Sequence, residues 1–332
     1  MKPQNSIRLI WVFVMLSMII TACTMPKRKS PDATLVPVTA VPAPTEPQPT
    51  PVPPGFSPAD LPSKQLDQAD DANSSSLAAA KNISAGDSFV QGLYERPINA
   101  DTMDKYFPYM DIVHIKGYTD DTWGYLEISL ADTNKTGKLP AQYAAELDLD
   151  KDGHGDWLIR ASSPASTSWT TQGVQAWQDA DRDVGGIVSM AADSNQSNGN
   201  GYETLVFNQG KGHIPNGAWV RISPDDPKSV QIAIKLSMIG SPSSFAMGAW
   251  AGDKIDPSKF DYNDHLTHVQ AGDPNQGYPQ VYPVKALAQI DNTCRLAMGF
   301  VPTSVVPGLC EVPQIQHPGA APTSPIIYHV PG

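Results

Sequence analysis

Residues 123–130 read WGYLEISL, and the alternation within them indicates the fold class. Leu126, Ile128 and Leu130 fall on one side of an extended chain. The opposite side carries the residues Trp123, Tyr125, Glu127 and Ser129. Apolar residues at a period of two are typical of an antiparallel strand with one buried and one solvated face. The stretch therefore predicts a half-buried β-strand.

Residues 229–236 (SVQIAIKL) repeat this alternation, and similar short runs recur between turn residues along much of the chain. Such a pattern is typical of a sandwich or a barrel. We expect an all-β fold over residues 87–300, an antiparallel β-sandwich of the jelly-roll kind, with a short helix at residues 100–106. The nine predicted strands are Ile112–Gly117, Trp123–Leu130, Tyr143–Asp148, Asp156–Ala161, Gly173–Asp179, Glu203–Asn208, Ala218–Ile222, Ser229–Leu236 and Phe245–Ala251.

An acidic loop between two of these strands carries the most specific chemistry in the sequence. Residues 147–157 read LDLDKDGHGDW. Aspartates at alternate positions, followed by a glycine that allows a sharp turn, aim their oxygens at one centre in calcium-binding loops. Ile159 stands where an EF-hand has glutamate, so this is not an EF-hand. We expect bound Ca²⁺; the alternative is an acidic hairpin turn. The candidate ligands are Asp148, Asp150, Asp152, Asp156 and the backbone carbonyl of His154.

A second acidic run, DADRDVGG, covers residues 179–186. Val184 stands where a calcium loop has glycine, and Arg182 could neutralise part of the charge. The run is therefore a second metal site, a part of the first site, or a solvated turn. Its candidate ligands are Asp179, Asp181 and Asp183, and a further oxygen-rich group contains Asp261 and Asp264.

Cys294 and Cys310 are the only cysteines besides Cys23. Exported proteins meet an oxidising environment, so an even pair predicts a disulfide bond between Cys294 and Cys310. The alternative is two free thiols. No set of cysteines and histidines has the spacing of a zinc site.

The N-terminal residues predict export. A positively charged start precedes the apolar residues 9–22, a stretch too short for a comfortable membrane span, which needs about 20 residues. The junction Ile20-Thr21-Ala22-Cys23 resembles a bacterial lipobox. We expect residues 1–22 to be a lipoprotein signal peptide and Cys23 to carry the lipid that anchors the protein at the outer face of the cell membrane. An ordinary signal peptide and an uncleaved anchor are the alternatives.

Proline-rich segments flank the predicted sandwich. Residues 31–62 contain eleven prolines, and such a composition favours extended polyproline II over a packed core. We expect residues 23–86 to be a disordered linker and residues 301–332 to be a proline-rich tail held by Cys310.

The charge balance excludes some classes of partner. The chain has 23 basic and 34 acidic residues, a net charge of −11, which disfavours nucleic acid, a ligand that needs a basic surface. It also disfavours electrostatic attraction to anionic lipids. The sequence contains no G-x-S-x-G motif, P-loop or G-x-G-x-x-G motif.

Three segments together resemble the superfamily of DOMON domains and family-nine carbohydrate-binding modules. They are DIVHIKGY at 111–118, DDTWGYLEI at 120–128 and LDLDKDGHGD at 147–156. The resemblance covers about half of the chain and implies a β-sandwich that binds glycans or, in some relatives, haem. No Met/His pair stands out as axial ligands for haem.

The expected function is non-catalytic binding of polysaccharide by a calcium-stabilised extracellular module. A structural or interaction module of the cell envelope is one alternative. A calcium-dependent glycan hydrolase is another.

Overall fold

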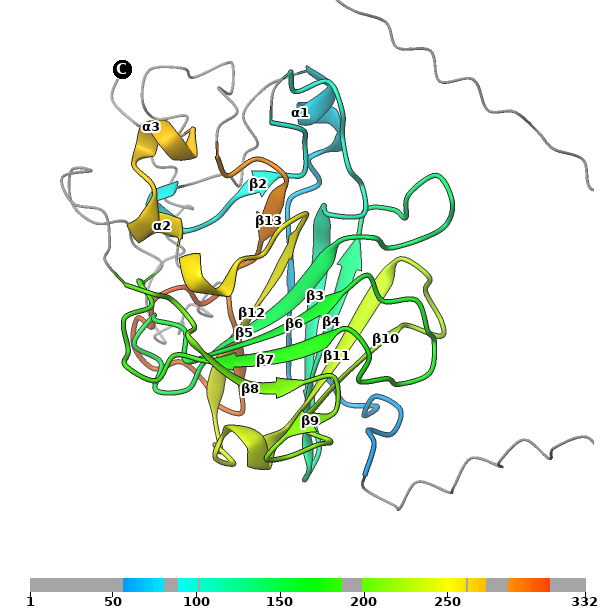
Figure 1. Ribbon diagram of the computed structural model, residues 1–332, viewed down its shortest axis with the longest axis vertical. Coiled ribbons are helices and arrows are strands. Elements are labelled where there is room, and N and C mark those ends of the chain that lie inside the picture. Colours follow the sequence, from blue (N-terminus) through cyan, green and yellow to red (C-terminus); the bar gives the residue numbers. More distant parts are fainter. Residues whose placement is uncertain are drawn as a thin grey trace, which may run out of the picture. The chain divides into compact units, whose positions relative to one another are not determined.

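The computed structural model describes residues 56–80, 89–100, 102–186, 199–260, 262–272 and 286–310. These residues form two antiparallel β-sheets with a few short helices (Figure 1). The all-β, sandwich-like fold predicted from the sequence is thus confirmed. The predicted signal peptide and Cys23 lie outside the described residues. None of the helices described has the length and apolar character needed to cross a membrane.

The first sheet has five strands in the order β1-β3-β4-β11-β10, each antiparallel to its neighbours. Its edges are β1, from the N-terminal part of the described chain, and β10. The bounds are β1 Asp67–Asp70, β3 Ile112–Thr119, β4 Trp123–Leu130, β10 Ala218–Ile222 and β11 Ser229–Lys235.

The second sheet has the order β2-β13-β12-β5-β6-β7-β8-β9, and β14 also pairs with β12. The strands β5, β6 and β7 follow one another along the chain and across the sheet. The bounds are β2 Glu95–Arg96, β5 Gln142–Asp148, β6 Trp157–Ser162, β7 Val174–Gln178, β8 Thr204–Asn208, β9 Lys211–Gly212, β12 Phe245–Gly252, β13 Ile290–Asn292 and β14 Leu296–Met298.

All nine predicted strands are present, with ends that differ by at most two residues. The alternation that predicted them also describes the packing. The aliphatic face of β4 joins that of β11 and residues of the second sheet, such as Ile159, in the main core between the sheets. The opposite face of β4, with Trp123 and Tyr125, packs in a separate outer cluster.

The helices are short and peripheral. Residues 100–106 form no helix in the part that the structure describes, so that prediction is wrong. The Asn99 side chain instead accepts a hydrogen bond from the backbone N–H of Lys105 across a turn, and Tyr106 bridges Ile98. The helices are α1 Ser75–Ala80, α2 Tyr262–His265 and α3 His268–Ala271, with single 3₁₀ turns at Phe89–Gln91, Leu236–Ile239 and Pro257–Lys259.

The linker boundary expected at residue 86 differs from the structure. Strand β1 pairs with β3 in register from Asp67 opposite Gly117 to Asp70 opposite His114. Before it, residues 56–66 lie against the outer face of the first sheet, where Leu61 packs on the outer aromatic cluster. The described fold therefore includes residues 56–80, because backbone pairing and a few apolar contacts, such as those of Leu61 and Ala69, hold a mostly polar segment on the first sheet.

Candidate metal sites and a polar groove

The acidic loop connects β5 to β6, and buried Asp148 organises it. One oxygen of Asp148 accepts a hydrogen bond from the Lys151 N–H (2.6 Å), and the other accepts from the Gly153 N–H (2.9 Å). Lys151 and Gly153 both have positive φ, which the sharp turn requires. Burial raises the pKa of Asp148 to about 6, although the nearby Arg295 guanidinium acts in the opposite direction. The fold thus holds a carboxylate in a place where its negative charge is poorly solvated.

Three of the five predicted ligands of this loop come together. Oxygens of Asp148, Asp150 and Asp156 lie within 4.8 Å of one another, a group that could hold a metal ion. Asp152 instead accepts a hydrogen bond from the N–H of His154 (2.8 Å). The His154 ring lies 2.9 Å from the carbonyl oxygen of Val184 in the second acidic run.

The second acidic run forms a similar turn after β7. Asp179 accepts hydrogen bonds from the N–H groups of Arg182 (2.7 Å) and Val184 (3.0 Å). Oxygens of Asp179, Asp181 and Glu203 lie within 4.8 Å of one another and could also hold a metal ion. Asp183 does not join them.

Two candidate residues of this region have other positions. Asp183 accepts a hydrogen bond from the N–H of Asn200 (2.9 Å). Asp264 lies so close to Gly185 that a Cβ at that glycine would meet its Oδ2 at 1.6 Å. Asp264 therefore packs beside the second run, whereas Asp261 lies outside the described residues.

Glu203 is a candidate ligand that the spacing of the two acidic runs does not indicate. It directly precedes β8, whose Thr204 pairs with Gln178 at the end of β7. Antiparallel pairing of these two strands therefore places Glu203 beside Asp179. Glu203 begins one of the predicted strands, but its position beside Asp179 follows only from the pairing of that strand with β7.

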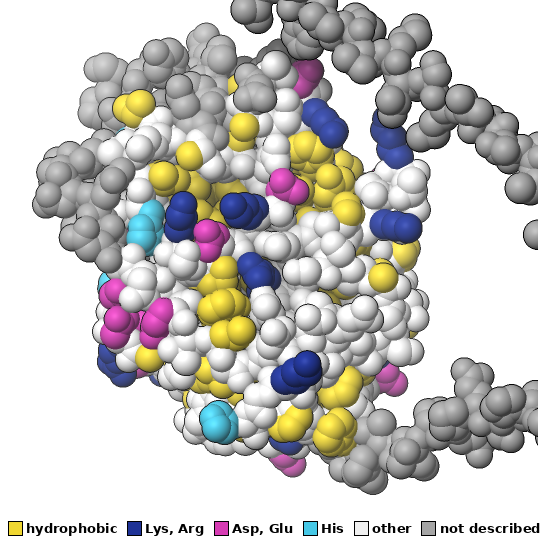
Figure 2. Space-filling model, in the orientation of Figure 1, with side chains coloured by type: hydrophobic (Ala, Val, Ile, Leu, Met, Phe, Trp, Pro, Cys, Tyr) yellow, Lys and Arg dark blue, Asp and Glu magenta, His cyan; other side chains and the backbone are white. Residues whose placement is uncertain are grey.

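The two acidic turns are neighbours. The Asp179 N–H donates to the carbonyl of Asp156 (3.0 Å), and exposed Arg182 lies 3.5 Å from Asp150. A shallow pocket of about 120 Å³ lies between the turns and is lined by residues of both. Figure 2 shows acidic side chains gathered at the left edge of the face, where Figure 1 places the loops that follow β5 and β7. The runs thus form two adjacent carboxylate clusters.

The predicted disulfide bond is present, and the segment that it closes lies next to the first acidic loop. Cys294 and Cys310 are bonded, with Cα atoms 4.9 Å apart. The chain that they close carries Pro307, whose Cβ would lie 2.6 Å from a Cβ built on Gly153. This disulfide-closed segment, residues 294–310, therefore packs directly against the turn of the acidic loop.

A separate polar groove crosses the outer face of the first sheet. Its volume is about 680 Å³. Its floor carries side chains of β3, β4, β10 and β11, and one wall is the segment 60–65. Tyr118 lines it, but no tryptophan does within the part of the chain that the structure describes.

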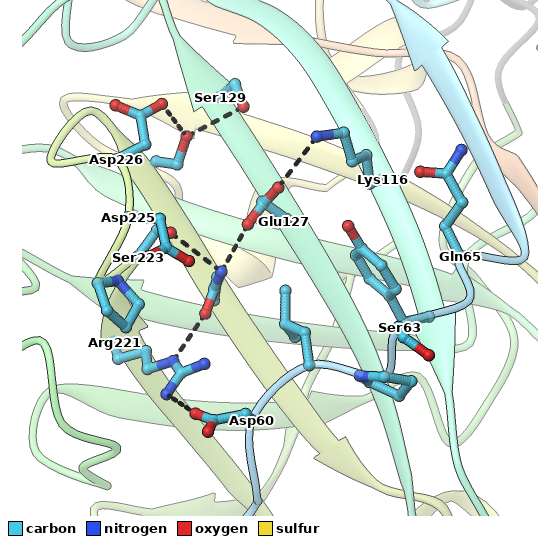
Figure 3. Close-up of a pocket in the computed structure, with 16 residues that line it drawn as sticks. Asp60, Ser63, Gln65, Lys116, Glu127, Ser129, Arg221, Ser223, Asp225 and Asp226 are labelled. Carbon is cyan, nitrogen blue, oxygen red and sulfur yellow. Dashed lines mark hydrogen bonds and ion pairs between the residues drawn. The ribbon is translucent and has the colours of Figure 1, made fainter.

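A hydrogen-bonded ladder crosses the floor of the groove from strand to strand (Figure 3). The Lys116 ammonium lies 3.5 Å from Glu127, and Glu127 accepts a hydrogen bond from the Gln231 amide (2.5 Å). The Gln231 oxygen accepts from Arg221 Nε (2.7 Å), and Arg221 Nη1 donates to Asp60 (3.1 Å). Within the sheet, each residue of this ladder lies directly opposite the next one on the neighbouring strand. Strand pairing therefore places the four polar groups in line.

The ladder is anchored at its Arg221 end. Arg221 is buried and its guanidinium stacks on the Trp169 ring, with a distance of 4.4 Å to the ring centre. Trp169 donates a hydrogen bond from its indole N–H to the carbonyl of Ala59 (2.8 Å). The segment before β1 thus completes the groove and fixes the direction in which its polar groups point.

Comparisons with protein-family models, curated proteins and solved structures found no match to this chain. The resemblance to DOMON domains and family-nine carbohydrate-binding modules therefore gains no support from them.

Proposed function

We propose that this chain is an exported, lipid-anchored protein whose sandwich domain binds polysaccharide without cleaving it. The observation that carries the proposal is the polar groove on the first sheet. Its volume of about 680 Å³ lies in the range of small-molecule sites. Its floor offers ammonium, guanidinium, amide and carboxylate groups in a row, which together donate to and accept from hydroxyl groups.

The charges of the groove favour a neutral ligand. Its lining contains the acids Asp60, Glu127, Asp225 and Asp226 and the bases Lys116 and Arg221. Acids exceed bases there, as they do in the whole chain, so phosphate-rich or strongly anionic polymers are disfavoured. A polymer of neutral sugars carries no charge to be repelled. Its hydroxyl groups can also hydrogen-bond with the carboxylates and the cations of the groove alike.

We further propose that Ca²⁺ binds the carboxylate clusters of the two acidic turns and stabilises them. The donors there are oxygens only, a set that hard divalent cations prefer. Asp150 and Asp181 are exposed, so an ion can enter from solvent. The ion would act on stability and would not take part in chemistry at the groove.

Binding to insoluble polysaccharides tests the leading proposal. The full chain is incubated with a panel of insoluble glucans, xylans, mannans and chitin, and the bound fraction is measured. Lys116→Met should reduce binding at least several-fold, because it removes a donor from the groove floor. Lys211→Met is the matched control, since Lys211 is exposed on β9 of the other sheet.

Two outcomes would replace the proposal. If no polysaccharide retains the protein, the domain is a structural or interaction module of the envelope. If the protein releases soluble sugars from any member of the panel, it is a hydrolase. Equal binding by Lys116→Met and Lys211→Met would show that the polysaccharide binds outside the groove.

A further inference from the structure

A third group of carboxylates lies inside the fold, where the two sheets approach each other. Oxygens of Asp71, Glu95 and Asp291 lie within 4.8 Å of one another. Asp71 directly follows β1 of the first sheet. Glu95 in β2 and Asp291 in β13 are register partners in the second sheet. The group therefore joins both sheets through residues that are far apart in the sequence.

Two of these three side chains are buried and Asp71 is partly exposed, whereas each acidic turn contains an exposed aspartate. Glu95 is 3% exposed and Asp291 is 0% exposed. Asp291 Oδ2 accepts a hydrogen bond from the Ile112 N–H (2.5 Å), but Oδ1 has no hydrogen-bond partner. Asp71 Oδ2 is also buried without a partner. Two carboxylate oxygens thus lack a donor at the place where three acidic side chains converge.

Such an arrangement is stable only if the carboxylates are protonated or a positive charge lies beside them. Among the described residues, no lysine, arginine or histidine forms an ion pair with Asp71 or Asp291. Ionised carboxylates in a low-dielectric interior are costly unless they are paired, protonated or bound to a metal. Burial, together with the neighbouring carboxylates, raises the pKa of Glu95 and of Asp291.

Surrounding groups hold two of the carboxylates in position. The Ser74 hydroxyl donates to Glu95 (2.8 Å), and the Ser74 N–H donates to buried Asp111 (3.1 Å). Tyr106 also donates to Asp111. Asp111 is therefore satisfied by protein donors and lies beside the site. The Asp71 carboxyl also hydrogen-bonds with that of Glu95, so the oxygens without a protein donor are Oδ2 of Asp71 and Oδ1 of Asp291.

We propose that Asp71, Glu95 and Asp291 bind a buried divalent cation of the calcium class that fastens β1 to the second sheet. Three carboxylates supply hard oxygen ligands from three separate segments, which suits Ca²⁺. Because Asp71 follows the first strand of the described chain, the ion would secure that strand and the wall of the groove that precedes it. The site is separate from the acidic turns and does not depend on what the groove binds.

Calcium titration of the full chain tests this site once the surface clusters have been weakened. The background variant carries Asp150→Asn and Asp181→Asn. After removal of metal with a chelator, this background should still bind one Ca²⁺ per chain in isothermal titration. Saturating Ca²⁺ should raise its melting temperature by about 5 °C or more. Adding Asp291→Asn or Asp71→Asn should remove both effects.

The controls separate binding from folding. Far-UV circular dichroism establishes that each variant is folded, and the partly exposed Asp71 gives the milder substitution if Asp291→Asn fails to fold. A background variant that binds no Ca²⁺ would overturn the proposal, because the buried carboxylates then share protons only. One retained Ca²⁺ in a folded Asp71→Asn variant would also overturn it. Loss of polysaccharide binding by the groove variants has no bearing on either result.

Discussion

Arg295 Nη1 lies 3.4 Å from Oδ2 of Asp148, and both side chains are buried. The same guanidinium lies 3.4 Å from Glu146, which accepts hydrogen bonds from Tyr202 and Trp250. Arg295 follows the bonded Cys294 directly. The disulfide-closed segment therefore supplies the positive charge beneath the acidic loop, and the loop depends on a residue from near the end of the described chain.

Removing this charge should destabilise the protein strongly. Arg295→Met leaves Glu146 and Asp148 buried without their cation, a change that typically costs about 3–5 kcal/mol. Urea unfolding in chelator measures the loss. Arg182→Met is the control, because Arg182 meets Asp150 at an exposed site and should change the stability by less than about 0.5 kcal/mol. Equal effects of the two variants would contradict the role of Arg295.

The disulfide bond should add stability of similar size. Cys294 and Cys310 are 16 residues apart, and closing a loop of this length stabilises by about 3 kcal/mol in the chain-entropy model. The double variant Cys294→Ala, Cys310→Ala should show this loss in urea unfolding. Reducing agent should destabilise the native chain by a comparable amount and leave the double variant unchanged. An unchanged native chain under full reduction would contradict the prediction.

The sequence predicted the strands that carry their own signal. In β4 and β11 every second residue is apolar and buried, so periodicity located them and assigned the face that forms the main core. The opposite face, which was expected to be solvated, is largely buried as well. Strand β1 (DQAD) has no apolar period, because it is an edge strand held by backbone pairing with β3. Its assignment to the linker followed from that composition.

The candidate sites also differ in whether a local sequence pattern records them. The first acidic turn is local, so spacing alone brought Asp148, Asp150 and Asp156 to attention. The groove ladder and the Asp71, Glu95 and Asp291 group consist of single residues from separate strands and from the segments that flank β1. Only the strand order brings them together, and no short motif records that order.

Calcium binding at the first turn should depend on Asp150 without a large folding cost. Asp150 is exposed, whereas Asp148 also holds the turn through the backbone N–H groups of Lys151 and Gly153. Asp150→Ala should therefore leave the melting temperature in chelator nearly unchanged and remove one Ca²⁺-binding step. Asp148→Ala should lower the melting temperature even in chelator. An Asp150→Ala chain with the full calcium stoichiometry would contradict the assignment.

The buried carboxylates should make the stability of the metal-free protein fall as pH rises. Burial raises the pKa of Asp71 from 3.8 to about 7 and that of Asp111 to about 6. The folded state therefore retains protons that the unfolded state has lost. This contribution is complete below about pH 4 and disappears as the pH passes the folded-state values. Each retained proton gives a slope of about 1.4 kcal/mol per pH unit at most.

Urea unfolding at several pH values, with and without Ca²⁺, measures this effect. In chelator the free energy of unfolding should decrease between about pH 5 and pH 8. The additional stability from saturating Ca²⁺ should increase over the same range, because metal ligands must be deprotonated. Asp71→Asn should flatten the chelator profile near neutral pH, since it removes the group whose pKa lies there. A metal-free protein that gains stability from pH 5 to pH 8 would show that these carboxylates are already ionised and paired in the folded state.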